Sequence, residues 1–254
     1  MSINNIAISF TAAHLQTKAE LLAAQLKFPV TVLTANQYDF LLVYTEQHLE
    51  IRPINQPTLG PVYIDFLAGK LGYRRSHTFI KNELLAKAIG VKGNNALKVI
   101  DATAGLGRDS FILACLGCQV IMLERSVIMA TLLNDGLQRL MATQALSDPL
   151  SLQLVNDFAQ NYLEQLIDTE FPQVIYLDPM YPHRTKTALV KKELRVLRAL
   201  VGDDPDADQL FQIALKRAKN RVVVKRPRLA PAINNQKPDH SHIGKQHRFD
   251  VYLI

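Results

Sequence analysis

The segment that most constrains the fold of this chain is residues 99–109, which read VIDATAGLGRD. Its apolar start predicts a short strand, and the pattern from about Asp109 onward predicts a helix that buries Phe111. Gly105 and Gly107 lie between the two elements. Glycine allows a tight backbone turn and leaves no Cβ atom in the way of an approaching molecule. The segment therefore predicts a strand–loop–helix unit whose loop can receive a ligand.

Further apolar segments recur along the chain at 120–123, 152–155, 174–177 and 221–225, with helical patterns between them. Strands that are apolar throughout are expected to be buried on both faces, as in a parallel sheet covered by helices on each side. Residues 249–254 predict a last, antiparallel strand. The fold class is therefore α/β, with a mostly parallel, doubly wound sheet whose ligands bind at the carboxyl ends of the strands.

Residues 1–95 follow a different pattern. A short strand at 4–10 precedes a helix that Thr11 can cap, and short β-like runs separated by polar or proline-rich turns follow between residues 30 and 66. These features predict a small α+β subdomain over residues 1–95, followed by the main domain over residues 96–254.

An acidic residue follows the second predicted strand of the main domain. Glu124 comes nineteen residues after Gly105 and directly after the strand at 120–123. A carboxylate at this position suits the two hydroxyl groups of a ribose. We therefore expect a ligand with a nucleoside part over the glycine loop.

Two classes of ligand use such a loop. A dinucleotide site has a third glycine where this chain has Ser110, and the carboxylate of Asp109 would repel a pyrophosphate. S-adenosylmethionine has no phosphate, and its cationic sulfonium and amine suit Asp101, Asp109 and Glu124. The pattern DATAGLGRD resembles the first motif of the Rossmann-like S-adenosylmethionine-dependent methyltransferases. The resemblance implies that S-adenosylmethionine is the cofactor.

The third predicted strand, at 152–155, is followed by Asp157 and Phe158. A carboxylate here can accept a hydrogen bond from an adenine amine while the neighbouring ring packs against the base. Asp157 can equally cap the helix that follows it. Both interpretations stay open at this point.

The fourth predicted strand ends in Asp178, Pro179, Met180 and Tyr181. This sequence resembles the D/N-P-P-Y/F motif of methyltransferases that modify exocyclic amines of nucleobases, with Met180 where the second proline usually stands. Such an amine is a poor nucleophile because its lone pair is delocalised into the ring. Hydrogen bonds to Asp178 and to the carbonyl of Pro179 would favour a pyramidal nitrogen, and Tyr181 could stack on an extruded base. The alternative is an ordinary Asp-Pro turn.

The net charge of +6 is unevenly distributed. From Arg184 to the end there are sixteen Lys and Arg residues against seven Asp and Glu residues, whereas residues 1–183 have thirteen against sixteen. This part of the chain predicts a surface for a polyanion such as RNA, although a solvated basic surface is the alternative. The candidate RNA-binding residues are Arg74, Arg75, Arg184, Lys191, Lys192, Lys225 and Arg226.

Longer segments sharpen the resemblance. The glycine-loop motif, MLER, YLDPMYPH, ALVKKELRVL and RVVVKRP, in this order and spacing, are similar to the RsmJ family of bacterial small-subunit ribosomal RNA guanine-N2 methyltransferases. The similarity extends over nearly all of the chain from about residue 60. It implies methylation of a guanine N2 amine in 16S ribosomal RNA, either free or in the small ribosomal subunit. It also implies cofactor contacts at Arg108, Asp109, Glu124, Arg125, Asp157, Phe158 and Asp178.

Two segments depart from the pattern of that family. Residues 76–81 stand where the family tends to be rich in glycine, and residues 157–159 stand where it usually has small serines. Two other functions are compatible with a fold of this class, since fold does not determine function. They are a nicotinamide-dependent oxidoreductase and a non-catalytic RNA-binding module.

The remaining features indicate no further chemistry. Cys115 and Cys118 fit a reducing compartment and are expected to be buried, without a metal or redox role. The polar segment 234–246, which holds two histidines, is expected to be a flexible loop and not a metal site. No apolar run is long enough to span a membrane, and residues 1–5 lack the features of a signal peptide, so we expect a cytoplasmic protein.

Overall fold

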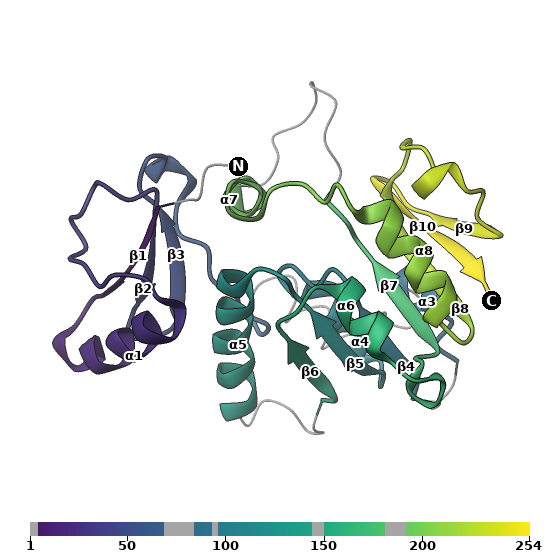
Figure 1. The fold of residues 1–254 in the computed structure, drawn as a ribbon, viewed down its shortest axis with the longest axis horizontal. Helices are drawn as coiled ribbons and strands as arrows, with labels where there is room; N and C mark the ends of the chain where they lie inside the picture. Colours follow the sequence, from purple (N-terminus) through teal and green to yellow (C-terminus); the bar gives the residue numbers. More distant parts are fainter. Residues whose placement is uncertain (1–4, 69–83, 93–95, 144–149, 181–191) are drawn as a thin grey trace.

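The computed structural model describes residues 5–68, 84–92, 96–143, 150–180 and 192–254. Its main element is a seven-stranded sheet with the strand order β6-β5-β4-β7-β8-β10-β9 (Figure 1). The first five strands in this order are parallel, and β10 pairs antiparallel with β8 and β9. The bounds are β4 Lys98–Asp101, β5 Gln119–Leu123, β6 Leu152–Val155, β7 Val174–Leu177, β8 Arg221–Pro227, β9 His240–Ile243 and β10 His247–Leu253. The predicted Rossmann-like α/β fold with an antiparallel last strand is confirmed.

Helices cover both faces of this sheet because successive strand residues point to opposite sides. Val99 belongs to one apolar cluster, together with Phe111 and Leu133. Its neighbour Ile100 belongs to a second cluster, together with Leu163 and Phe211. The helices are α3 Leu84–Ile89, α4 Arg108–Cys115, α5 Val127–Ala142, α6 Ala159–Gln165, α7 Lys192–Val201 and α8 Ala207–Arg217. The sheet is therefore doubly wound, as predicted.

The N-terminal part has a sheet of its own, as predicted. It contains β1 Ile6–Phe10, α1 Gln16–Leu26, β2 Phe40–Tyr44 and β3 Leu49–Pro53, and the strand order is β1-β2-β3. Two predicted runs, 30–33 and 62–66, do not form strands. Each contributes a single bridge, at Val30 and at Val62. Helix α3 precedes residue 95 but contacts β8, β9 and β10 of the large sheet, so a domain boundary at 95 stays a prediction.

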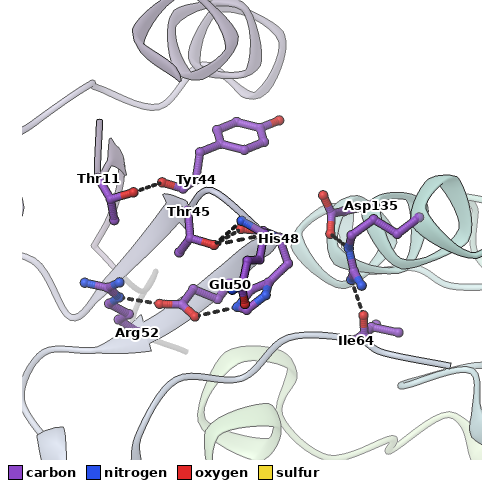
Figure 2. Close-up of polar contacts among 10 residues, drawn as sticks. Thr11, Tyr44, Thr45, His48, Glu50, Arg52, Ile64 and Asp135 are labelled. Carbon is purple, nitrogen blue, oxygen red and sulfur yellow. Dashed lines mark hydrogen bonds and ion pairs between the residues drawn. The ribbon is translucent and has the colours of Figure 1, made fainter. Parts of the chain in front are cut away.

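The two sheets are joined through α5, which separates the three-stranded sheet from β6 in Figure 1. Arg139 of α5 donates hydrogen bonds to Asp135 (2.9 Å) and to the carbonyl of Ile64. Figure 2 shows Asp135 and Ile64 beside the turn between β2 and β3. On β3, buried Glu50 accepts hydrogen bonds from His48 (2.9 Å) and Arg52 (2.6 Å). A polar junction and a shared apolar cluster thus connect the N-terminal part to the main sheet.

The C-terminal segment differs from its expectation. Residues 234–246 were expected to be a flexible loop, yet they contain β9, which pairs with β10. Backbone hydrogen bonds do not depend on apolar side chains, so a polar sequence can form an edge strand. No cluster of metal-binding side chains occurs among the described residues. No helix within the described ranges is long and apolar enough to cross a membrane.

Gly136 provides a test of the contact between α5 and the N-terminal part. A Cβ atom there would lie 2.8 Å from Cγ2 of Ile64 and 3.1 Å from its carbonyl oxygen. Alanine normally stabilises a helix by about 1 kcal/mol relative to glycine. We expect Gly136→Ala instead to lower the free energy of unfolding by about 1–3 kcal/mol, because of overpacking. Urea denaturation measures this change.

The matched control is Asn134→Ala, an exposed position on the same helix. It should be neutral or stabilising by up to about 0.5 kcal/mol. If both variants are stabilised, the close approach of Ile64 to α5 is wrong.

Candidate functional site

A cavity of about 1060 Å³ lies at the carboxyl ends of the parallel strands. Because these ends meet at one edge of the sheet, the segments predicted to carry the site come together there. Of the predicted residues, those that line the cavity are Asp101, Gly105, Arg108, Asp109, Glu124, Arg125, Asp157, Asp178, Pro179, Lys225 and Arg226.

The two glycines of the loop have different roles. Gly105 has φ +53° and faces open space, since an added Cβ atom would meet only the carbonyl of Thr103 at 3.9 Å. Gly107 has φ +67°, precedes α4 and does not line the cavity. A Cβ atom there would lie 2.8 Å from Cδ2 of Leu133. Gly107 therefore permits the turn and close packing, and the structure does not support the predicted cofactor contact at this residue.

Glu124 is tied to the glycine loop. Its carboxylate accepts hydrogen bonds from the backbone N–H groups of Gly105 (3.0 Å) and Ser126 (2.8 Å). The side chain of Asn156 donates to the carbonyl oxygen of Glu124 (2.7 Å) and so connects the ends of β5 and β6. Burial raises the pKa of Glu124 to about 7, although the two backbone hydrogen bonds oppose this shift.

Asp101 stabilises the glycine loop through hydrogen bonds on the buried side. It is buried and accepts hydrogen bonds from the hydroxyl of Ser110 and from the N–H of Thr103 (3.1 Å). Ser110 is the residue that stands where a dinucleotide site would have its third glycine, so this position has a structural partner here. Burial raises the pKa of Asp101 to about 7, the two hydrogen bonds lower it, and the carboxylates of Asp109 and Asp178 raise it further.

A network of charged side chains lies where β7, β8 and α4 meet. The ammonium of Lys225 lies 2.8 Å from Asp109 and 2.8 Å from Asp178, and Asp109 also accepts from the hydroxyl of Tyr176 (2.7 Å). Burial lowers the pKa of Lys225, but the two carboxylates outweigh that effect and hold the pKa above its usual value. Lys225, which was predicted to bind RNA, is thus an internal partner of the two acids.

The loop after β7 is held by residues that sequence reasoning did not select. The N–H of Asp178 donates to the hydroxyl of Thr103 (2.6 Å), and the N–H of Met180 donates to the carboxylate of Asp204 (2.6 Å). The N–H of Asp204 donates back to the carbonyl of Met180 (3.2 Å). We call this pair of bonds the Asp204 clamp. The only signal in the sequence that could have identified Asp204 is the acidic character of residues 203–206.

Arg125 connects the Asp204 clamp to the end of β5. Its guanidinium lies 2.6 Å from Asp204 and 3.2 Å from Asp206. Asp206 also accepts from the side chain of Gln160 (2.5 Å). Arg125, the residue after Glu124, is therefore linked through Asp204 to the loop that carries Asp178 and Met180.

Asp157, Phe158 and Arg226 are the other predicted residues whose side chains the structure describes. Phe158 is 51% exposed and does not line the cavity, whereas Asp157 lines it and accepts from the N–H of Phe158 (2.7 Å). Helix α6 begins at Ala159 with no side-chain cap, so Asp157 is not its cap.

Arg226 is buried and donates to the carbonyl of Pro231 (2.9 and 2.5 Å). This position does not support the predicted RNA contact, because Arg226 holds a protein loop.

Several predicted residues lie outside the described part of the structure. They are Arg74, Arg75, Tyr181, Arg184 and Lys191. Lys192 is the first residue of α7, but the position of its side chain is likewise outside the description.

The lining residues fit S-adenosylmethionine better than a dinucleotide. Acidic residues outnumber Lys and Arg among them, and Asp101, Asp109, Glu124 and Asp178 surround the glycine loop. Such a set favours a cationic sulfonium and amine and disfavours a pyrophosphate. Gly105 leaves space for a ligand against the backbone.

The fold and this site define an S-adenosylmethionine-dependent methyltransferase. A family model described as "Putative SAM-dependent methyltransferase" matches residues 22–254. The crystal structure of a SAM-dependent methyltransferase from Neisseria gonorrhoeae superposes with a TM-score of 0.71 at 33% identity, and covers 97% of this chain and 95% of that one. The nicotinamide-dependent alternative is therefore abandoned.

Two relatives identify the family more closely. Both carry the name ribosomal RNA small subunit methyltransferase J. The protein of Coxiella burnetii strain RSA 331 is 47% identical over 99% of this chain and 98% of its own length. That of Thioalkalivibrio sulfidiphilus is 45% identical over 100% and 99%. The chain belongs to the ribosomal RNA small subunit methyltransferase J (RsmJ) family.

The Asp204 clamp leads to a prediction about activity. Asp204→Ala removes the acceptor of the Met180 N–H, so the loop after β7 loses its position. We expect methyl transfer to fall roughly tenfold or more, which corresponds to the loss of a charged hydrogen bond. Initial rates with labelled S-adenosylmethionine measure the effect.

The matched control for this variant is Asp206→Ala, which also removes a partner of Arg125 but does not touch Met180. Its rate should fall less. Equal losses in the two variants would attribute the effect to Arg125 and not to the loop.

Asp101 leads to a prediction about pH. Between pH 4 and pH 7 the folded protein retains a proton that the unfolded chain has released, because burial raises the pKa of this carboxyl to about 7. The folded state therefore binds more protons in this window, and stability declines as pH rises through it. Asp101→Asn cannot ionise and keeps an oxygen acceptor. Relative to the wild type, its stability should improve from pH 5 to pH 7 and then level off above pH 8.

Urea denaturation at each pH provides the test. Glu124 titrates in the same direction, so the variant should reduce the decline without abolishing it. A stability difference between variant and wild type that does not change with pH would show that Asp101 is ionised throughout.

Proposed function

We propose that this protein transfers a methyl group from S-adenosylmethionine to the exocyclic N2 amine of a guanine in 16S ribosomal RNA, free or within the small ribosomal subunit. The single observation that carries the choice of an amine is the placement of Asp178. Its carboxylate lines the same cavity as Gly105. Both Asp178 and Asp109 contact the ammonium of Lys225. The ribosomal RNA substrate is supported by the names of the relatives.

The side chain of Asp178 is suited to hold an amine. It is 39% exposed within the cavity, so a substrate can reach it, and its backbone is held by Thr103. Pro179 also lines the cavity, and its ring fixes φ, which restricts the direction of its carbonyl. Acceptance of amine hydrogen bonds by these two groups favours a pyramidal nitrogen with an available lone pair.

Bound S-adenosylmethionine supplies an already activated methyl group, which the amine nitrogen takes as the carbon–sulfur bond breaks and one amine proton is released. The protein therefore contributes mainly by positioning. Asp101, Asp109, Glu124 and Asp157 are the acids proposed to hold the donor. The ammonium of Lys225 lies between the carboxylates of Asp109 and Asp178. Its positive charge allows the two carboxylates to lie close together.

The basic residues of the C-terminal part are proposed to contact RNA phosphates. Arg195 on α7 is exposed, whereas Arg198 is paired with Asp203 at 3.1 Å. Arg74, Arg75, Arg184, Lys191 and Lys192 remain candidates on sequence grounds. Phosphate contacts of this kind make binding sensitive to salt.

The assignment of guanine N2 is tested by nucleoside mapping. We expect 16S ribosomal RNA from cells without this gene to lack one N2-methylguanosine, and the purified protein with S-adenosylmethionine to restore it. Mass spectrometry of nuclease fragments measures both. A missing methyl group at any other atom would overturn the assignment.

A second prediction concerns Asp178 itself. Asp178→Ala should lower turnover about a hundredfold or more, because the amine loses its acceptor, while the dissociation constant for S-adenosylmethionine changes much less. Methyl transfer assays and calorimetry measure the two quantities. Asp178→Asn, which keeps one oxygen acceptor, is the matched variant and should retain more activity. An equal loss of turnover and donor affinity would assign Asp178 to donor binding alone.

A further inference from the structure

Leu229 is the most exposed large apolar side chain in the described part of the structure, at 93%. It lies at the tip of a β-turn, since the N–H of Ala230 donates to the carbonyl of Pro227 (3.0 Å). Tips of such turns favour Gly, Asn, Asp or Ser, so the turn itself gives no reason for a leucine. The exposed side chain of Leu229 is therefore available for a contact with another molecule.

The turn is held by the side chain of Arg248. The guanidinium of Arg248 donates to the carbonyls of Pro227 (3.2 Å), Arg228 (2.8 Å) and Ala230 (2.8 Å). Arg248 is itself held by two contacts with the buried carboxylate of Asp250, at 2.8 and 2.9 Å. Arginine is well suited to this role because its donors are arranged in a rigid plane. The protein thus presents an apolar side chain to solvent on a fixed support.

A second arginine supports the other end of the turn. Arg226, which is buried, donates to the carbonyl of Pro231 through two nitrogen atoms. This contact explains why an arginine predicted to bind RNA directly lies inside the protein. Its position is consistent with an indirect role in which it shapes the segment that carries Leu229.

The turn lies at the rim of the cavity. Pro227 and Gln246 line the cavity, and the N–H of Arg228 donates to the carbonyl of Gln246 (3.0 Å). Lys225, which contacts Asp178, precedes Leu229 by four residues, so their Cα atoms are at most about 14 Å apart. The exposed side chains of Arg228 and Lys245 flank this rim and can contact phosphates.

We propose that Leu229 is a wedge that enters the base stack of the RNA beside the target guanine and fills the space that the guanine leaves when it turns into the cavity. The inference rests on the proposed function, because an amine inside a stacked helix is out of reach of Asp178. Extrusion of a base breaks stacking, and apolar side chains inserted between bases offset that cost. The rigid turn ensures that the wedge does not collapse onto the protein.

The test compares variants of the full chain on small ribosomal subunits from cells without this gene. Leu229→Ala should lower kcat/KM for methyl transfer about tenfold or more, since unstacking is no longer compensated. Leu229→Met, which keeps the length and apolar character, should stay within about twofold of the wild type. Leu21→Ala, at a 68% exposed position on α1, is the matched control and should be unchanged.

Two further measurements separate a wedge from a structural role. The affinity for S-adenosylmethionine and the melting temperature of Leu229→Ala should equal those of the wild type, because the Leu229 side chain is 93% exposed. On an RNA fragment with 2-aminopurine beside the modified guanine, the wild type should raise the fluorescence and Leu229→Ala should not. Full activity of Leu229→Ala, or loss of donor affinity with it, would overturn the wedge. Absence of guanine methylation by the wild type would instead overturn the proposed function.

Discussion

Strand β4 lies between β5 and β7 and pairs in parallel with both, and the site depends on this register. Asp101 is opposite Met122 of β5 and Tyr176 of β7. All three strands therefore end at the same level, and the residues just beyond them face one cavity. A shift of one residue in β4 would turn Asp101 to the other face of the sheet and separate it from Ser110.

Within that cavity the distribution of charge determines what can bind. Acidic side chains outnumber Lys and Arg in its lining, and the ammonium of Lys225 lies between Asp109 and Asp178. This arrangement allows two carboxylates to lie close together in a partly buried place without strong repulsion. Asp101 and Glu124 differ from this pair, because burial raises the pKa of each carboxyl to about 7.

The loop that follows β7 shows how the chemistry of the site depends on distant segments. Asp178 is held by Thr103 of the glycine loop, and Met180 is held by Asp204 of the segment before α8. Arg125 connects Asp204 to the end of β5. The glycine loop, the end of β5, the loop after β7 and the segment before α8 are thus connected by hydrogen bonds and ion pairs.

The sequence by itself determined the five parallel strands of the main sheet with helices between them, the antiparallel last strand and the acids at the strand ends. Apolar runs and glycine positions are local signals, and parallel pairing brings strand ends to one edge. Only the tertiary structure decided which side chains pair. Lys225 meets Asp109 across 116 positions, and Arg125 meets Asp204 across 79. It also showed that Gly107 serves packing, that Arg226 is buried and that residues 240–243 form an edge strand. These outcomes depend on which surfaces touch after folding, and no local pattern encodes that contact.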